Sequence, residues 1–469
     1  MRIALSLPSR FLLGSAQLGC GLSSLWRFRL FAGLAILLLI VSTVRAAERH
    51  TPQTPAPTRN NTKAQTAHKQ HSAKPIFTTS GQTPSLRKVS RSEPPEQGLS
   101  SARIEQQLQA IYLAIGQADN RSALALAEDL TRTQPNFQLG HMLYADLLLA
   151  QTRPVALPGS APEALTRAAP GAITDLRAEA KVRIKAQQER PPAAALPENF
   201  TALSRWNEQA IAVDISKSRL YLFTRNAAGE LSLAHDYYIS IARLGAIKNN
   251  EGDLRTPLGP YFITSHLYPT QLPDFYGAGA LPLNYPNPYD MRRGKSGSGI
   301  WLHGTPKNQY SRPPQASEGC VVLTNPDFRT VAQSVSLRST PVLIAKSLRW
   351  VQKTGAWEAS FDATWQAWRQ QKLNHQPADM ARFYYASFAG QGGQNWGGFY
   401  RQLQNEMRQT RVISANIDKV SRVYWRESAD EEIVVTTFVQ NLGGKEKNRR
   451  QYWRKKGSSP WRIFYESDV

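Results

Sequence analysis

Cysteine, acidic side chains and long apolar runs are all scarce in this chain of 469 residues. Its two cysteines, Cys20 and Cys320, are too few for a disulfide framework. The longest apolar run, Leu30 to Val44, has 15 residues, fewer than the roughly 20 that a membrane-spanning helix needs. Asp and Glu number 35 against 57 Lys and Arg, a net charge of +22. This excess of positive charge favours a polyanionic partner. The candidates are nucleic acid, an anionic membrane face and an anionic wall polymer.

The first 46 residues resemble an export signal. An apolar run follows basic residues, and Val44-Arg45-Ala46 offers small side chains at a cleavage site. Residues 1–46 are therefore predicted to be a signal peptide, or an uncleaved anchor that would tie the protein to the membrane. Either reading exports the chain to the periplasm or cell envelope and removes most of the case for nucleic acid. Cleavage would leave one thiol, Cys320, which is either an inert buried filler or a reactive group.

Composition divides the rest of the chain. Residues 47–100 carry eight Lys or Arg against three Glu and few large apolar residues, which predicts a disordered basic linker. Apolar residues recur at helical spacing over 101–151, so three short helices are expected, with Asn120 placed to cap the second. The spacing of small residues there is similar to a tetratricopeptide repeat. Residues 152–204, a polar helix between Pro-rich joints, are predicted to be a linker.

The period changes to two after Trp206, which predicts a hairpin with its turn at Lys217-Ser218 and a compact, mainly β domain over 205–346. Beyond it, three helical runs precede four long alternating strands. That order resembles the cone of the nuclear transport factor two-like (SnoaL-like) superfamily and predicts an α+β domain over 355–469. The fold class is therefore multidomain: a mainly β domain between a small α-helical module and a SnoaL-like cone.

The candidate catalytic residues lie in two segments. Sixteen residues separate His303, within Trp301-Leu302-His303-Gly304-Thr305, from Cys320, within Ser317-Glu318-Gly319-Cys320-Val321. A cysteine nucleophile needs a neighbouring imidazole, because the thiolate attacks and a free thiol is mostly protonated at neutral pH. Gly319 permits a tight turn that brings backbone N–H groups to a developing oxyanion.

These segments, with the upstream turn Gly252-Asp253-Leu254-Arg255-Thr256-Pro257-Leu258-Gly259, resemble the L,D-transpeptidase (YkuD-type) family over about 140 residues. The resemblance implies that Cys320 is the nucleophile, that His303 is its base, and that the Gly304 carbonyl orients the imidazole. It implies an oxyanion site at the backbone of Gly319 and Cys320, and neither metal nor cofactor. Ser317, Arg292 and Thr256 are the candidate substrate-binding side chains.

Two positions depart from the family pattern. Glu318 stands where a second His is common, and Val322 stands where an Arg or Asn usually binds substrate, so Arg292, Arg293 or Arg312 is expected to substitute. Glu318 would raise the pKa of the thiol, but we expect the imidazole to prevail and Cys320 to react quickly at neutral pH. The stretch from Tyr268 to Ser298 is predicted to form a lid or cleft rim.

The resemblance implies an L,D-transpeptidase that forms a thioester on tetrapeptide stems of peptidoglycan, in cell-wall biogenesis and cell shape. The alternatives are an L,D-carboxypeptidase, in which water is the acceptor, and a non-catalytic wall-binding scaffold. The expected partners are peptide stems, together with envelope proteins bound through the helical and C-terminal modules. Because every motif residue precedes Lys346, the C-terminal domain is expected to be dispensable for the chemistry. The acceptor and the oligomeric state stay open.

Overall fold

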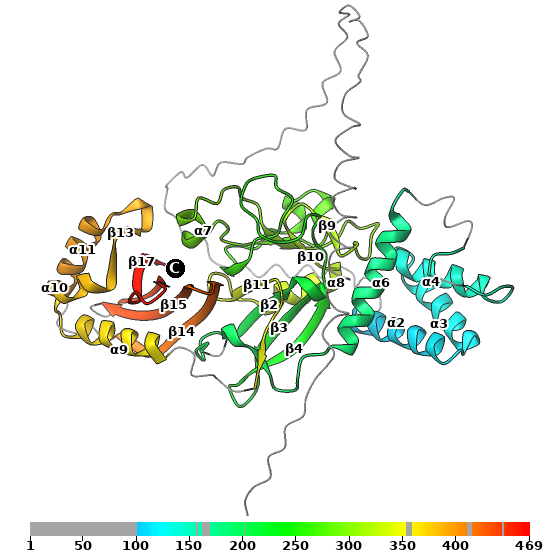
Figure 1. Cartoon of the computed structure of the whole chain (residues 1–469), viewed down its shortest axis with the longest axis horizontal. Helices are drawn as coiled ribbons and strands as arrows, with labels where there is room; N and C mark the ends of the chain where they lie inside the picture. Colours follow the sequence, from blue (N-terminus) through cyan, green and yellow to red (C-terminus); the bar gives the residue numbers. More distant parts are fainter. Residues whose placement is uncertain are drawn as a thin grey trace, which may run out of the picture. The chain divides into compact units, whose positions relative to one another are not determined.

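The computed structural model describes residues 101–155, 158–161, 169–200, 202–352, 359–409, 415–442 and 445–469 (Figure 1). The predicted signal peptide, the basic linker and Cys20 lie outside the described residues. Among the helices of the described ranges, none is long and apolar enough to cross a membrane.

The first described module is helical. Its helices are α2 (Ser101–Gly116), α3 (Asn120–Thr133), α4 (Gln138–Leu149) and α6 (Ala172–Gln188). The predicted periodicity is confirmed, since Ile104, Leu108 and Ile111 of α2 are fully buried in the module's core. The predicted cap is wrong by one residue, because the side chain of Asp119 accepts the N–H of Ser122.

Helix α6 lies within the segment predicted to be a linker, yet it packs on this module. Its small residues Ala180 and Ala186 are buried, and so are the charged Glu179 and Arg183. Charged residues are rarely fully buried unless they are paired, so the polar sequence of α6 gave no sign of a packed helix. The helical module therefore extends to residue 188, and its last helix buries an ion pair.

The central domain is mainly β, as predicted. Its first strands and turns are β1 (Leu196–Pro197), η1 (Glu198–Phe200), β2 (Gln209–Asp214), η2 (Ile215–Lys217), β3 (Arg219–Arg225), β4 (Leu231–Tyr238), β5 (Ile241–Ala242) and β6 (Gly259–Phe262). Further along the chain follow η3 (Pro269–Gln271), η4 (Asp274–Tyr276), β7 (Ala280–Pro282), α7 (Pro288–Arg292), β8 (Trp301–His303), β9 (Gln315–Ser317), β10 (Val321–Val322), α8 (Asn325–Ser334), β11 (Pro341–Ala345) and β12 (Trp350–Val351).

Five strands form the main sheet, in the order β4-β3-β2-β11-β6. The predicted hairpin is its centre: β2 and β3 pair antiparallel with Val213 opposite Leu220, and η2 makes the turn. A smaller sheet, β10-β8-β7, packs against it through a shared core that includes Ile211, Leu302 and Val321. The short strand that ends in His303 is therefore backed by packed apolar side chains, which hold it rigidly.

The second face of the main sheet is also buried. Ala210 and Ala212 of β2 are fully buried beside Phe223 of β3, and the same cluster includes Val423 of the C-terminal domain. The alternating pattern of β2 indicated a strand with one buried and one exposed face, because Ala counts as neither clearly apolar nor clearly polar in such a pattern. The main sheet is instead covered on both faces, so its strands contribute side chains to two hydrophobic cores.

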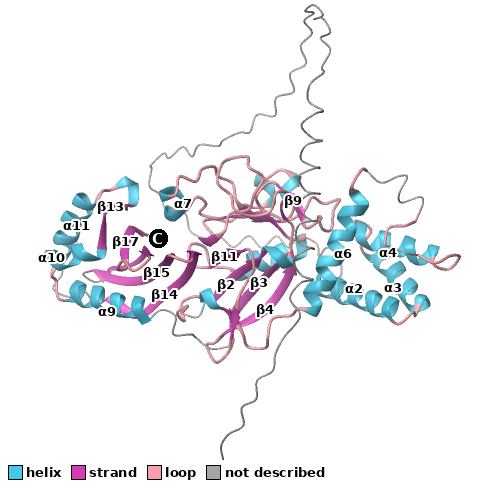
Figure 2. Ribbon diagram, viewed as in Figure 1, coloured by secondary structure: helices cyan, strands magenta, loops and turns pink. Residues whose placement is uncertain are grey.

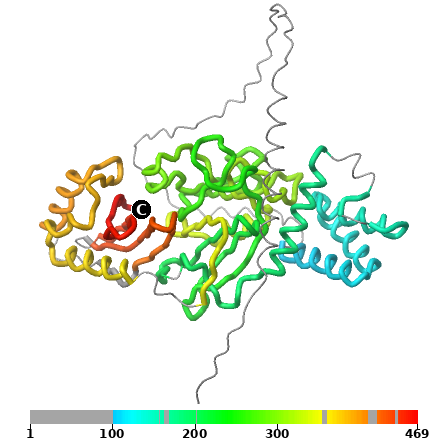
Figure 3. Tube along the Cα trace, in the orientation of Figure 1, coloured from blue at the N-terminus to red at the C-terminus, as the bar shows by residue number. Residues whose placement is uncertain are grey.

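The C-terminal domain places helices beside a curled sheet (Figure 2) that is antiparallel except for the parallel pairing of its strands β13 and β17. Its elements are α9 (Ala359–Leu373), α10 (Pro377–Met380), η5 (Ala381–Phe383), β13 (Tyr384–Gly390), η6 (Gln391–Gly393), α11 (Trp396–Gln409), β14 (Ala415–Ser428), β15 (Glu431–Leu442), β16 (Lys445–Lys456) and β17 (Arg462–Asp468). The sheet order is β13-β17-β16-β15-β14, and the path from yellow helices to red strands can be followed in Figure 3.

The inside of this sheet is filled by aromatic side chains. Trp365, Trp368 and Trp453 are fully buried, and the rings of Trp365 and Trp368 stack with their centroids 5.0 Å apart. The helix expected over 378–388 is wrong in its second half, because Tyr384–Gly390 forms the strand β13. The run Tyr384-Tyr385 favours a strand, and it pairs with β17.

Candidate active site

Parallel pairing of β8 with β10 brings the two predicted catalytic residues together. Val321 lies opposite Leu302 and Val322 opposite His303. Cys320 directly precedes β10, and the backbone N–H of Trp301 approaches its thiol. Residues 304 to 319 make the crossover between the two strands.

His303 is held in one orientation. Its Nδ1 lies 2.6 Å from the carbonyl oxygen of Gly304, and only 1% of the residue is exposed. Because a carbonyl can only accept, Nδ1 carries the proton and Nε2 is left as the basic nitrogen. Burial, opposed by the Gly304 bond and assisted by the Arg312 charge, lowers the pKa of His303 to about 4. The imidazole is neutral at physiological pH and can accept a proton.

Asn325 fixes the carbonyl that orients His303, a role that no sequence pattern had indicated. Its Oδ1 accepts the N–H groups of Ala278 (2.8 Å) and Thr305 (3.2 Å), and its Nδ2 donates to the Thr305 carbonyl (2.9 Å). A Cβ on Gly304 would lie 2.2 Å from that Oδ1, so only glycine fits there. Asn325 begins α8, and an Asn at a helix start reads as an ordinary terminus.

The thiol of Cys320 is protonated in the resting site. It donates a hydrogen bond to the Gly299 carbonyl at 3.3 Å. Burial raises the pKa of Cys320 to about 11; the Trp301 N–H and the Arg312 charge oppose this, and the Glu318 charge adds to it. The residue as a whole is partly exposed, so solvent reaches its surroundings. The direction of this shift opposes the expectation of a fast thiolate and favours a neutral thiol in the same site as a neutral imidazole.

The turn before the nucleophile is shaped by Ser317 and Gly319. The Ser317 hydroxyl donates to the Cys320 carbonyl at 2.6 Å and accepts the Gly319 N–H at 3.3 Å. Gly319 has φ +151°, and a Cβ there would meet Ile300 at 2.8 Å. Ser317 is buried, so it shapes the turn and does not face substrate. Of the two predicted oxyanion donors, the Cys320 amide has no hydrogen bond within the described part of the chain, whereas the Gly319 amide has one.

Aromatic rings and one arginine flank the imidazole. The ring centroids of Tyr276 and Phe275 lie 5.1 Å and 5.9 Å from that of His303. The guanidinium carbon of Arg312 lies 4.3 Å from the centre of the Phe275 ring. Of the rim predicted from Tyr268 to Ser298, this part borders the site, whereas Tyr285 and Tyr289 are buried away from it.

An open groove of about 830 Å³ is lined in part by Glu318, two residues before Cys320 in the chain. Its walls carry both signs of charge, from Arg243 and Arg312 on one hand and Asp175, Asp274 and Glu318 on the other. Such walls suit a ligand that carries both an amine and a carboxylate.

The other candidate substrate-binding residues lie elsewhere. Thr256 is fully buried and its hydroxyl accepts the Ala242 N–H at 3.1 Å, so it shapes the fold. Arg292 donates to the Ser387 hydroxyl at 2.8 Å, and Arg293 pairs with Glu427 at 2.6 Å, so both contact the C-terminal domain. Among the three arginines considered, Arg312 is the one at the groove. Within the described ranges, no group of three or more His, Cys, Asp or Glu is arranged for a metal ion.

Residues 208–344 match the model of the L,D-transpeptidase catalytic domain (YkuD). This segment is therefore similar to L,D-transpeptidase catalytic domains, a class typically formed by cysteine enzymes that modify peptidoglycan. Among solved structures, the chain is similar to Bd1075 of Bdellovibrio bacteriovorus, at 25% identity over 59% of this chain and 98% of that one, with a TM-score of 0.46.

Two further similarities are weaker. The helical cell shape determining protein Pgp2 of Campylobacter jejuni shares 19% identity over 57% of this chain and 95% of that one, with a TM-score of 0.44. An L,D-transpeptidase of Mycobacterium smegmatis shares 14% identity over 29% of this chain and 58% of that one, with a TM-score of 0.20. No curated protein matches the chain.

Proposed function

We propose that the protein is an exported cysteine acyltransferase that attacks tetrapeptide stems of peptidoglycan through Cys320. The observation that carries the proposal is the orientation of His303, whose Nδ1 faces the Gly304 carbonyl at 2.6 Å and whose Nε2 is left free to take a proton. Parallel pairing of β8 and β10 places this base next to the strand that follows Cys320. The match of residues 208–344 to a family that acts on peptide stems supplies the substrate class.

In this reaction, sulfur attacks the carbonyl carbon before the terminal D-alanine while Nε2 of His303 takes the thiol proton. Because both groups rest neutral, proton transfer and attack are coupled in one step. The Cys320 N–H stabilises the oxyanion. The imidazolium then returns its proton to the leaving amine, D-alanine departs and a thioester remains on Cys320.

The acceptor of the acyl group decides the outcome. An amine from a second stem gives a cross-link and therefore a transpeptidase. Water gives a tripeptide and therefore an L,D-carboxypeptidase, which is the second candidate because Cys320 is partly exposed and an open groove reaches the neighbouring Glu318. Arg312 replaces the usual arginine after the cysteine, where this chain has Val322, and binds a carboxylate of the stem.

The remaining parts of the proposal come from the sequence. A signal peptide at 1–46 exports the chain, residues 47–100 form a basic linker, and the enzyme works in the periplasm or cell envelope in wall biogenesis and cell shape. The C-terminal domain belongs to the SnoaL-like cones, supported by its helices beside a curled five-stranded sheet. The module that begins at residue 101 is tetratricopeptide-like, supported by the hydrophobic core that its consecutive helices α2, α3 and α4 share.

The test is incubation of the purified protein with tetrapeptide muropeptides, with the products identified by mass. A dimer larger than the substrate identifies the transpeptidase, and loss of one alanine identifies the carboxypeptidase. Cys320→Ala should abolish both products and His303→Ala should reduce their rate by about two orders of magnitude or more, while folding changes little. Unchanged muropeptides with the natural sequence, or turnover by Cys320→Ala, would overturn the proposal.

A further inference from the structure

The crossover between the two catalytic strands is anchored outside the catalytic domain. The segment of residues 304–314, called here the crossover loop, leaves His303 and leads to β9, three residues before Cys320. A change in its position therefore reaches both ends of the candidate pair. The contacts of this loop decide how firmly the site is held.

The first anchors come from α2 and the start of α4. Asn136 donates from its side chain to the Lys307 carbonyl at 3.0 Å and accepts the Tyr310 N–H at 3.2 Å. The Tyr310 ring lies 4.8 Å from that of Phe137, and its hydroxyl is 3.1 Å from that of Ser101. The helical module thus contacts the crossover loop through hydrogen bonds with its backbone, an aromatic ring contact and a hydroxyl contact.

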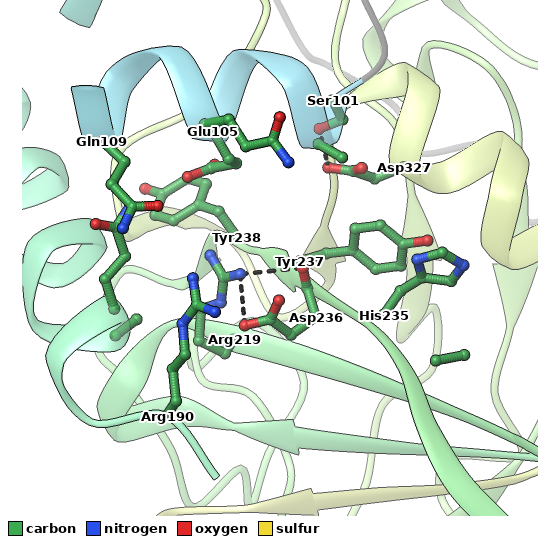
Figure 4. A pocket seen from close by; sticks show the side chains of 15 residues that line it. Ser101, Glu105, Gln109, Arg190, Arg219, His235, Asp236, Tyr237, Tyr238 and Asp327 are labelled. Carbon is green, nitrogen blue, oxygen red and sulfur yellow. Dashed lines mark hydrogen bonds and ion pairs between the residues drawn. The ribbon is translucent and has the colours of Figure 1, made fainter. Parts of the chain in front are cut away.

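A buried arginine of α6 organises the second set of anchors. Arg183 is fully buried; it donates to Glu179 at 2.7 and 3.0 Å and also pairs with Glu105 of α2. The same Glu179 oxygen accepts the Ser311 hydroxyl at 2.7 Å. The guanidinium carbon of Arg183 lies 3.8 Å from the centre of the Tyr238 ring. Figure 4 shows Glu105 and Tyr238 in the polar pocket of about 220 Å³ between α2 and β4.

These anchors end at the arginine of the active site. The Tyr238 hydroxyl donates to the Arg312 carbonyl at 2.7 Å, next to the anchored Ser311. The Arg312 side chain lies over Phe275, and its charge favours the thiolate of Cys320 and disfavours the charged form of His303. Helix α6 also reaches the groove directly, because Asp175 is part of its wall.

We propose that the helical module is a working part of the active site, in which Arg183 is a positioning residue that holds Arg312 over Phe275 at the groove through Ser311 and Tyr238. A buried ion pair adds little net stability over apolar packing, but it fixes the geometry of what it contacts. The claim that Arg312 binds a stem carboxylate rests on the proposed function. The claim that its positive charge acts on the thiol does not.

Two alkylating reagents of different charge test this in the full-length protein. Anionic iodoacetate is attracted by a cation near the thiol, whereas neutral iodoacetamide is not, so the ratio of their rates reports that cation independently of access. The informative change is Ser311→Ala combined with Tyr238→Phe, which removes two hydroxyls and no packing. Replacing Arg183 itself would strand the buried Glu179 carboxylate and could unfold the module.

In Arg312→Gln we expect the ratio of the iodoacetate rate to the iodoacetamide rate to fall about threefold, which is the effect expected of one neighbouring charge screened by solvent. The double variant should lower the ratio by a comparable amount. The combined triple variant should fall no further than Arg312→Gln alone, since both changes remove the same effect. Ser232→Ala with Tyr400→Phe, which removes two hydroxyls away from the loop, should leave the ratio unchanged.

An unchanged ratio in Arg312→Gln, an unchanged ratio in the double variant, or additive effects in the triple variant would overturn the inference. None of these rates requires a muropeptide, so failure of the proposed function and failure of this inference are told apart.

Discussion

The two modules that flank the catalytic domain hold it in different ways. The C-terminal sheet covers the second face of the main sheet mainly with apolar side chains, such as Val423 against Phe223, and keeps ion pairs such as Arg293 with Glu427 at the edge. The helical module instead meets the crossover loop largely through hydrogen bonds and the buried pair of Arg183 and Glu179. One contact buries area and the other fixes positions.

Apolar burial is non-directional and roughly proportional to area, so the C-terminal contact contributes to whether the central domain folds. Hydrogen bonds contribute less net stability but demand particular distances and angles. The helical contact is thus suited to setting the geometry of the site. Changes on the C-terminal side should lower stability, and changes on the helical side should alter reactivity.

The largest expected effect is loss of the fold when the chain ends after Lys346. Truncation exposes the face that carries Tyr221, Phe223 and Phe262, three aromatic side chains buried in clusters shared with the C-terminal domain. Exposed apolar patches of this kind lead to aggregation. Size-exclusion chromatography and circular dichroism should show aggregated or unfolded protein. A soluble, folded and reactive fragment would restore the expectation that the C-terminal domain is dispensable.

A single core change should separate the two contacts. Phe223→Ala removes a fully buried ring and should lower the free energy of unfolding by about 3–5 kcal/mol, measured in urea. Tyr310→Phe, on the helical side, removes only the hydroxyl that meets Ser101 and should lower it by about 1 kcal/mol. Iodoacetamide rates of the folded Phe223→Ala protein should stay unchanged. Equal losses of stability would remove the difference between the modules.

The pH dependence of the thiol follows from its raised pKa. With a pKa near 11, the thiolate fraction of Cys320 increases about tenfold per pH unit throughout the range below that value. The alkylation rate should therefore rise from pH 7 to pH 10 without a plateau. A plateau reached below pH 8 would mean that imidazole and thiol form an ion pair at rest, as the sequence had led us to expect.

Much of the fold could be predicted from local sequence patterns. The hairpin of β2 and β3, the helix α11 and the four long C-terminal strands follow periods that short-range packing dictates. The same patterns missed what depends on partners distant in the sequence. Ala210 and Ala212 do not reveal a second buried face, and the charged residues of α6 do not reveal that Glu105 and Ser311 will satisfy them.

The site divides in the same way. Cys320, His303 and Gly304 could be proposed from the sequence because acyl transfer requires a thiol, a base and an orienting group near one another. Asn325 and the anchors of the crossover loop were not predictable, since an Asn at a helix start or a Tyr in a loop has many ordinary uses. The direction of the thiol pKa shift was not foreseen, because burial, its largest cause, cannot be read from neighbouring residues in sequence.

The smallest expected effect compares two opposite charges near the thiol. Arg312 is almost fully buried and anchored through the loop, whereas Glu318 is exposed on the groove. An exposed charge is screened by water, so Glu318 should influence Cys320 less than Arg312 does. Glu318→Gln removes a charge that raises the thiol pKa; the pKa falls, the thiolate fraction rises, and iodoacetamide should react faster.

We expect the Glu318→Gln gain at pH 8 to be about twofold, below the loss caused by Arg312→Gln, because only the arginine is held at a fixed distance. Raising the salt concentration should shrink the glutamate effect more than the arginine effect, since buried charges are screened less. If both effects shrank equally, Arg312 would be as mobile as Glu318, and the anchors from the helical module would not position it. A complete loss of muropeptide turnover in Glu318→Gln, with alkylation preserved, would instead make Glu318 a substrate-binding residue of the groove.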